Sequence, residues 1–421
     1  MPTAPDDAEI ELIRRSGVAL RVGRLSLSAG TGSYRVKASM ARTARALGIE
    51  EHQAHVTLTE ITTTSHQGSS FRTEVTEVRS VGIDANRLSA LERFAQDVEA
   101  HAPVTVEDAT RELDRIQSTP PLYPALLNAL WAAIACAAFA FLNNGGPVEV
   151  IGVFFAAGAG QLLRRSLVHR GWNQFGVTML AAALASLTYV ALLAVFAAFG
   201  GEAVSHEAGY VSAVLFLVPG FPLVTGALDL AKLDFSAGLA RLTYALMIMT
   251  SAALALWGVS MIVGLTPDPE GPAGLDPGLL LGLRLLASFL GVLGFALMFN
   301  SPWTMAVAAA AIGMVANVGR LWLVDHGVAV QAAAAAAALV VGLLAAVVAP
   351  RMNVPRVTVS VPAVVIMVPG ATAYRAVFHL SNGETTQALA YAVEAGLVVA
   401  CLAIGLAVAR MLTDREWGFE R

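Results

Sequence analysis

The stretch VSAVLFLVPGFPLVTGALDLA at residues 211–231 decides the fold, because an apolar run long enough to cross a membrane contains a helix breaker. A second apolar run, residues 357–378, carries the same Val-Pro-Gly phrase at residues 368–370. Proline removes a backbone donor and glycine frees the chain, so each phrase predicts a break near mid-span. In hydrocarbon, a broken helix needs protein or a water-filled cavity to satisfy the freed backbone groups. Paired breaks in two halves of a membrane protein therefore indicate a transport site.

Composition supports a membrane protein, because 56% of the 421 residues are hydrophobic and only 14% are charged. The net charge of −4 gives no reason to expect a nucleic-acid partner. The two cysteines, Cys136 and Cys401, lie in apolar runs and are too few for a disulfide framework. The first residues show no signal peptide, so we expect the N-terminal region to stay in the cytoplasm.

Charge is concentrated in residues 1–123, which hold 14 of the 27 basic and 17 of the 31 acidic residues. We expect this region to be a small cytoplasmic α+β domain. Its apolar periodicity and β-branched runs predict a helix at 7–27, a second helix ending at Gly48, a hairpin of strands at 56–64 and 71–80, and helices at 86–101 and 105–117. Ser33 or Thr31 is the expected N-cap of the second helix.

The rest of the chain predicts ten membrane spans. They are residues 124–142, 147–163, 174–199, 211–231, 239–264, 279–299, 303–319, 329–349, 357–378 and 387–409. Short matches recur at offsets of 156 and 150 residues, which predicts two five-helix repeats, 124–265 and 279–409, followed by a cytoplasmic tail at 410–421. Because each repeat has an odd number of spans, the second is inverted relative to the first.

Basic residues predict the orientation of these spans. Most arginines of the connecting loops fall on the side of the N-terminal region, whereas Glu202 and Asp268 fall on the other side. This positive-inside asymmetry places both termini in the cytoplasm.

Several phrases of the N-terminal region resemble the bacterial threonine/serine exporter family. They are Ala29-Gly30-Thr31-Gly32-Ser33-Tyr34-Arg35-Val36 running into Met40-x-Arg42-x-Ala44-x-Ala46-Leu47-Gly48, then Thr73-Glu74-Val75-Thr76-Glu77-Val78-Arg79-Ser80, and Asp84-x-Asn86-Arg87-Leu88. The ten spans with paired Val-Pro-Gly phrases resemble its membrane part. Lys37 is a departure, since the family commonly has an acidic residue there. The resemblance implies an inner-membrane exporter of threonine and serine that is driven by protons. In some relatives, associated with dicarboxylate export, the two halves are separate chains.

The candidate transport site consists of the two breaks and nearby ionisable residues. Helices restarting after Pro219-Gly220 and Pro369-Gly370 would direct their positive ends to mid-membrane, which suits a carboxylate. Ionisable residues inside a membrane are functional candidates, and here they are Asp229, Arg375 and Glu394. Simpler explanations stay open: proline kinks used for packing, an interfacial Asp229, and an ion pair of Arg375 with Glu394.

Other chemistry has little support in the sequence. No P-loop and no Gly-x-Ser-x-Gly elbow occurs, so neither ATP-driven transport nor serine hydrolysis is indicated. Glu51, His52, His55 and His66 lack the spacing of a metal site, and we expect no enzyme activity, metal or cofactor. The expected partners are the small amino acid, protons, the lipid bilayer and, for a homo-oligomer, further copies of the chain. The alternatives are a dicarboxylate exporter and a membrane-tethered signalling or enzymatic module.

Overall fold

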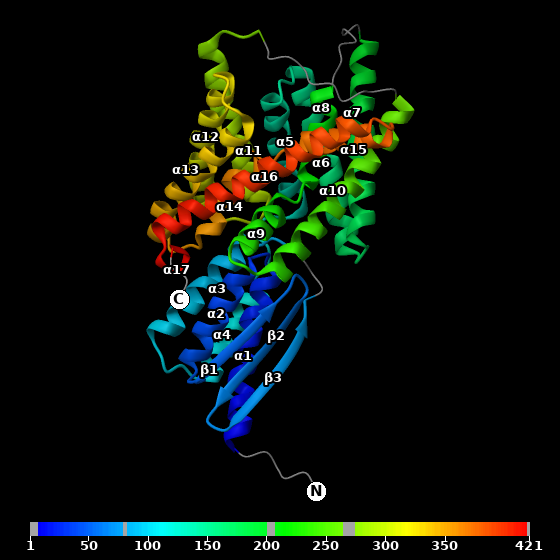
Figure 1. Cartoon of the computed structure of the whole chain (residues 1–421). Coiled ribbons are helices and arrows are strands. Elements are labelled where there is room, and N and C mark those ends of the chain that lie inside the picture. Colours follow the sequence, from blue (N-terminus) through cyan, green and yellow to red (C-terminus); the bar gives the residue numbers. More distant parts are fainter. Residues whose placement is uncertain (1–6, 79–81, 200–206, 264–273, 419–421) are drawn as a thin grey trace. The chain divides into compact units, whose positions relative to one another are not determined.

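The chain divides into two compact units (Figure 1). The computed structural model describes residues 7–78, 82–199, 207–263 and 274–418, so Glu202 and Asp268 lie outside the described residues. The first unit comprises Met1–Leu122, Thr225–Leu242 and Ala349–Thr358, and the second comprises Tyr123–Val224, Thr243–Val348 and Val359–Arg421. The N-terminal region is thus packed together with two short segments from the apolar part of the chain.

The N-terminal part of the first unit combines four helices, as its patterning predicts, with a three-stranded sheet. The helices are α1 (Asp7–Ser28), α2 (Ser33–Ala46), α3 (Ala85–Ala100) and α4 (Val106–Ser118). The antiparallel strands β1 (Glu51–Val56), β2 (Glu60–Gln67) and β3 (Ser70–Glu77) follow in the order β1-β2-β3. The expected two-stranded hairpin was incomplete, because β1 pairs with β2 along its full length. Ser80 of the expected hairpin lies outside the described residues.

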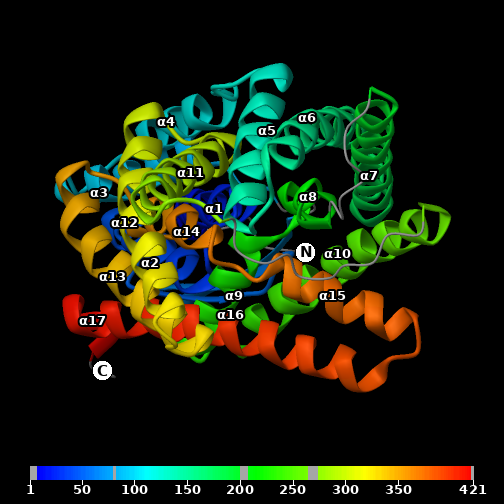
Figure 2. The same cartoon turned by 90° about the horizontal axis from the view of Figure 1, so that it is seen from above.

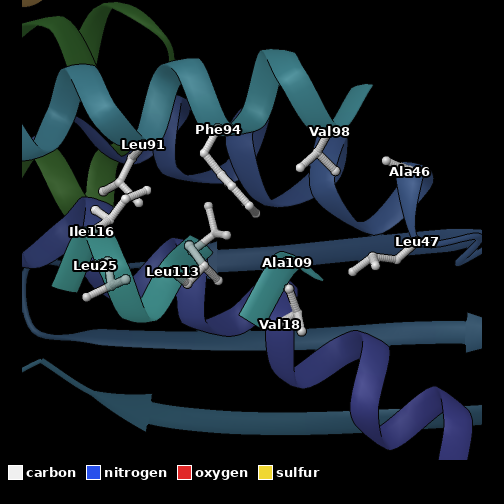
Figure 3. Close-up of a cluster of buried hydrophobic side chains, with 11 residues drawn as sticks. Val18, Leu25, Ala46, Leu47, Leu91, Phe94, Val98, Ala109, Leu113 and Ile116 are labelled. Atoms are coloured by element: carbon white, nitrogen blue, oxygen red, sulfur yellow. The ribbon is translucent and has the colours of Figure 1, made fainter. Parts of the chain in front are cut away.

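Two larger apolar clusters hold the described residues of this α+β part together, on either side of α1 and α2, and a smaller cluster of four residues lies between these two helices. One of the larger clusters lies between the sheet and the helices α1 and α2, and it includes Val36, Met40 and Ile61, each fully buried. The other lies among α1, α3 and α4, where Phe94, Leu113 and their neighbours point toward one another (Figure 3). The sheet therefore buries only one of its faces, and α1 and α2 form a middle layer between the sheet and the outer helices.

The cap of α2 differs from the expectation. Gly32, rather than Ser33 or Thr31, is the N-cap residue, and it supplies no side chain. Ser33 instead uses its own N–H and hydroxyl to bind two aspartates from the segment Thr225–Leu242. A carboxylate from elsewhere in the chain thus satisfies the first N–H of the helix, which explains why a local side-chain cap is unnecessary. Thr105, by contrast, caps α4 with its own side chain and accepts from Asp108 N–H at 3.1 Å.

Beyond residue 123 the described chain is helical. The helices are α5 (Ala125–Leu142), α6 (Pro147–His169), α7 (Gln174–Ala198), α8 (Glu207–Ser212), the 3-10 turn η1 (Leu215–Leu217), α9 (Gly220–Ala231), α10 (Phe235–Val263), α11 (Pro277–Met298), α12 (Trp303–Asp325), α13 (Val330–Arg351), α14 (Arg356–Val365), α15 (Gly370–Ser381), α16 (Thr385–Thr413) and α17 (Arg415–Gly418).

Seven of the described helices are long and apolar enough to cross a membrane, namely α5, α7, α10, α11, α12, α13 and α16. Two bent pairs, α8 with η1 and α9, and α14 with α15, raise the number of candidate spans to nine. Helix α6 covers the expected span 147–163 and has 23 residues, but its last turns carry Gln161, Arg164 and Arg165. The expected total of ten spans therefore requires α6 to be a span in addition to these nine candidates.

Small residues dominate the packing of the second unit. Helix α5 packs against α6 and α11, and α11 packs against α12. Figure 2 shows α15 and α16 side by side as an antiparallel pair. Fully buried alanines such as Ala132, Ala135 and Ala309 lie on these helices, so backbones approach closely. Close approach over small residues is the usual basis of helix association in lipid.

Candidate functional site

The two Val-Pro-Gly phrases form the same turn in the structure. The helix axis bends by 61° before α9 and by 53° before α15. Gly220 N–H donates to the Val218 carbonyl at 2.8 Å, and Gly370 N–H donates to the Val368 carbonyl at the same distance. In both turns the proline carbonyl accepts the next helical bond at 3.0 Å. The predicted breaks are therefore present, and both use one hydrogen-bonding pattern.

The two breaks contact each other. A methyl group placed on Gly220 would lie 3.1 Å from Val365 Cγ2, in the turn of helix before the second break. A methyl group on Gly370 would lie 2.6 Å from Leu215 Cδ2 and 3.1 Å from Val218 Cγ2, before the first break. Leu215 and Val365 are 150 residues apart, as are the two glycines. Each glycine thus contacts the residue that lies five positions before the glycine of the other break.

This crossing brings two helix N-termini into one apolar region. Gly220 and Gly370 are buried, and each begins a helix of 12 residues. The first N–H groups of a helix lack intrahelical acceptors and carry a partial positive charge. An anionic group is the ligand that such a pair of N-termini can stabilise. The arrangement has the chemistry of a carboxylate site.

Asp229 lies elsewhere, in the first unit near the end of α9. It is fully buried and forms an ion pair with Arg241 of α10, with 3.1 Å between Oδ2 and Nε. Its other oxygen accepts the Ser33 N–H at 2.9 Å, so Asp229 binds the N-terminus of α2. Asp229 is therefore engaged with the Gly-Thr-Gly-Ser phrase of the N-terminal region.

Further bonds make this contact a cluster, which we call the turn cluster and define as Thr31, Ser33, Lys37, Asp229, Asp234 and Arg241. Asp234 accepts from the Ser33 hydroxyl at 2.8 Å and pairs with Lys37, one turn further along α2. Arg241 donates to the Thr31 carbonyl at 2.7 Å. The lysine that departs from the family pattern thus has a specific partner here. Both ends of the α9–α10 turn are bound to the N-terminal region.

The second half carries a different cluster at the matching positions. His379 pairs with Glu384 and stacks on Tyr391, with ring centroids 5.2 Å apart. These three residues lie 150 positions after Asp229, Asp234 and Arg241, respectively. The backbone bond across each turn is the same: Asp234 N–H donates to the Asp229 carbonyl at 2.9 Å, and Glu384 N–H donates to the His379 carbonyl at 2.8 Å. The side chains of the two turns differ.

Arg375 and Glu394 lie in the second unit on the packed helices α15 and α16. Both side chains are partly buried. Arg375 lies five residues after Gly370, less than two turns from the N-terminus of α15. A guanidinium there adds a second cationic element on the helix whose N-terminus is the candidate anion site.

Sequence reasoning missed two buried hydrogen-bonded chains of polar side chains. Gln161 donates to the Asn128 carbonyl oxygen at 2.7 Å, and Asn128 donates to the Met298 backbone carbonyl at 2.9 Å. In the second half, Asn317 donates to the Ser288 hydroxyl at 2.9 Å. The signal for them was an isolated amide or hydroxyl in an apolar span. Such groups are hydrogen-bonded when buried, so they fix the registry of neighbouring helices.

Two family models match the chain. One, described as a threonine/serine exporter, matches residues 17–263, and another, described as threonine/serine exporter, ThrE, matches residues 284–412. A "Threonine/serine exporter" of Corynebacterium glutamicum is 25% identical over 415 residues, covering 94% of this chain and 82% of its own. A "Probable threonine/serine exporter" of Mycobacterium tuberculosis is 26% identical over 94% of this chain and 76% of its own.

A third relative carries a different substrate in its name. A "Probable succinate transporter subunit" of Escherichia coli K12 is 27% identical over 248 residues, covering 58% of this chain and 94% of its own. No solved structure matches the chain significantly.

Proposed function

Because the chain belongs to the threonine/serine exporter family, we propose that it exports threonine and serine across the bacterial inner membrane in exchange for protons. The observation that carries the proposal is the mutual contact of the two breaks at Gly220 and Gly370. Two half-helix N-termini near mid-membrane are a recurrent device for binding the carboxylate of a transported substrate. Transport of this kind needs no catalytic residue.

Helix bounds support two repeats, at residues 124–265 and 279–409. A shift of 156 residues carries α6 onto α12 at both ends, and a shift of 150 carries α9 onto α15 and α10 onto α16 at both ends. The two family models divide the chain between residues 263 and 284, close to the same boundary. With five crossings in each repeat, the second is inverted relative to the first. An inverted pair allows the site to open alternately to each side.

A cytoplasmic position of both termini follows from this arrangement. Residues 1–123 would be a cytoplasmic domain and residues 410–421 a cytoplasmic tail. Met1–Leu122 packs with Thr225–Leu242 and Ala349–Thr358, two segments that the arginine distribution assigns to the cytoplasm. Contact between regions assigned to one side supports the orientation.

At the site, the N-termini after Pro219-Gly220 and Pro369-Gly370 would bind the carboxylate, and Arg375 would add a charge-assisted hydrogen bond. A cationic site must release its anion on the far side. Protonation and deprotonation of Glu394, on the helix packed against α15, would change the local charge during the cycle. Asp229 would act differently: its turn-cluster contacts tie the end of α9 to the cytoplasmic domain.

The test is uptake of labelled threonine and serine into inverted vesicles, where export appears as uptake, with and without a pH gradient. A charge-assisted hydrogen bond worth about 1–3 kcal/mol predicts that Arg375→Ala raises KM roughly 5- to 150-fold. Glu394→Gln should weaken the pH dependence of transport and leave KM nearly unchanged. Arg170→Ala, at an exposed position after α6, is the matched control and should behave as wild type. Unchanged KM and pH response in both site variants would exclude this site.

The succinate transporter name of the Escherichia coli relative favours one second candidate, export of a dicarboxylate. Such a substrate presents a carboxylate at each end, which fits a site formed by two helix N-termini. Labelled succinate is therefore the second substrate in the same vesicles. Accumulation of succinate without accumulation of threonine or serine would replace the first proposal with this one.

A further inference from the structure

Strand β3 forms an open edge of the sheet in the described part of the chain. The sheet order is β1-β2-β3, so β3 pairs with β2 on one side. On its outer face Phe71 is 68% exposed and Val75 is 63% exposed. An exposed edge strand of eight residues with two large apolar side chains is a template for pairing with another chain.

The hydrogen-bonding alternation shows which backbone groups of β3 point outward. Val78 N–H donates to the Thr59 carbonyl at 2.8 Å, so this residue faces β2. Peptide groups alternate between the two sides of a strand. The N–H and C=O groups of Phe71, Thr73 and Val75 are therefore directed to the open edge, ready to pair.

The sequence of β3 is complementary to itself in one antiparallel register. Centring the pair on Thr73 places Phe71 opposite Val75 of a second copy and Arg72 opposite Glu74 of that copy. A shift of two residues in either direction places Arg72 opposite Arg72 or Glu74 opposite Glu74. Like charges directly opposite each other are destabilising, whereas opposite charges and apolar pairs are stabilising. The Thr73-centred register is thus selected by both charge and apolar contact.

The two charged residues of β3 already bind each other. Arg72 and Glu74 form an ion pair along β3 at 2.9 Å, and their side chains keep 35% and 16% exposure. Glu74 also accepts from the Ser16 hydroxyl of α1 at 2.7 Å, so its carboxylate lies on the face of the sheet that packs against α1. Two such pairs brought together make an alternating square of charges. The second copy therefore places a second carboxylate beside Arg72 and a second guanidinium beside Glu74. No charge is buried there without a counter-charge.

We propose that two copies of the chain associate through β3, antiparallel about Thr73, so that their three-stranded sheets join into one sheet of six strands. Three residues on each edge strand then exchange backbone hydrogen bonds with the partner. The occupant of the edge is a second copy of this chain, and the association does not depend on which substrate the protein exports.

Cysteine crosslinking in native membranes tests the register. In a Cys136→Ala, Cys401→Ala background, Thr73→Cys should crosslink to a dimer, because facing residues of a hydrogen-bonded pair have Cα atoms about 5.5 Å apart. Thr64→Cys is the matched control. It lies beside Thr73 on the same face but on β2, so the two copies would place these residues roughly three strand spacings apart. No dimer is expected from Thr64→Cys.

Three further substitutions distinguish this register from any other. Co-expressed, differently tagged Phe71→Cys and Val75→Cys copies should crosslink to each other, while Phe71→Cys alone should not. Adding Thr73→Lys, which opposes two lysines at the centre, should abolish that crosslink without reducing the amount of protein in the membrane. Thr73→Cys dimers no more abundant than those of Thr64→Cys would overturn the proposal. Crosslinks to a band of another mass would assign the edge to a different protein and overturn it equally.

Discussion

Asp229 and Arg241 form a buried ion pair across the turn that joins α9 to α10, with 3.1 Å between Oδ2 and Nε. Both also bind the start of α2: Asp229 accepts from Ser33 N–H, and Arg241 donates to the Thr31 carbonyl. In the sequence, Asp229 follows the glycine of the first break, Gly220, by nine residues on helix α9. Within the first unit, the pair therefore binds the end of α9 and the start of α10 to the residues that begin α2.

The first prediction concerns this pair. Asp229→Asn leaves Arg241 buried without its counter-charge, so we expect a loss of about 3–5 kcal/mol in the free energy of unfolding. Arg14→Ala, which breaks the exposed pair with Glu107, should cost less than about 1 kcal/mol. Thermal unfolding of the full chain in detergent measures both. The double variant Asp229→Asn, Arg241→Met should recover part of the loss, and a single variant as stable as wild type would contradict the prediction.

A second prediction concerns the glycine that caps α2. A methyl group on Gly32 would lie 2.8 Å from Asp229 Oδ1, so Gly32→Ala must displace the carboxylate from the helix N-terminus. We expect a lower unfolding temperature and faster hydrogen exchange at the start of α2. Gly17→Ala is the control, because nothing lies within 4 Å of the added methyl group in α1. There alanine should stabilise the helix by up to about 1 kcal/mol. Equal effects of the two substitutions would exclude the close contact.

The third prediction is a pH dependence at Glu92. Burial raises the pKa of this carboxyl, but Arg35 and Arg42 outweigh burial, and the net pKa is lowered. A lowered pKa in the folded state contributes stability above the ordinary value of about 4.3 and loses it as pH falls through the folded-state pKa. Hydrogen exchange in α3 should therefore differ between wild type and Glu92→Gln at neutral pH and converge only as the pH falls below the ordinary value of about 4.3 and through the lowered folded-state pKa. A constant difference over this range would contradict it.

Local sequence patterns were enough to predict the helices with strong apolar periodicity. The helices at 7–27, 86–101 and 105–117 appear as α1, α3 and α4 within a residue or two. Strand β1 was missed, because four of the six residues of EHQAHV are polar and within it no β-branched residue precedes Val56. Its place in the sheet is decided by pairing with β2 and packing against α2, neither of which is a local property.

Polar contacts between distant segments were the other feature that the sequence could not predict. Asp229 could be recognised as an unusual charge in an apolar run, but its partners Ser33 and Arg241 come from a distant segment and from the next helix. The Pro-Gly breaks were foreseeable, since proline and glycine act on the backbone wherever they stand. The contacts of Gly220 with Val365 and of Gly370 with Leu215 depend on how two broken helices cross. The only sign of that crossing in the sequence is the similarity between its two halves.

The fourth prediction tests that crossing. Gly370→Ala brings a methyl group within 2.6 Å of Leu215 Cδ2, and Gly220→Ala brings one within 3.1 Å of Val365 Cγ2, so each added methyl group must displace a side chain or the backbone at this crossing. Because a displacement here disturbs the helix N-termini, we expect a loss of transport with normal amounts of protein in the membrane, more severe for Gly370→Ala. Gly396→Ala is the matched control, an exposed glycine of α16 with nothing within 4 Å of the added methyl group, and it should transport as wild type. Reducing Leu215 to alanine beside Gly370→Ala removes the closest contact, leaves the one with Val218 Cγ2 at 3.1 Å, and should therefore restore part of the activity. Full transport by Gly370→Ala, or no rescue by Leu215→Ala, would show that the close approach of the two breaks does not matter for export.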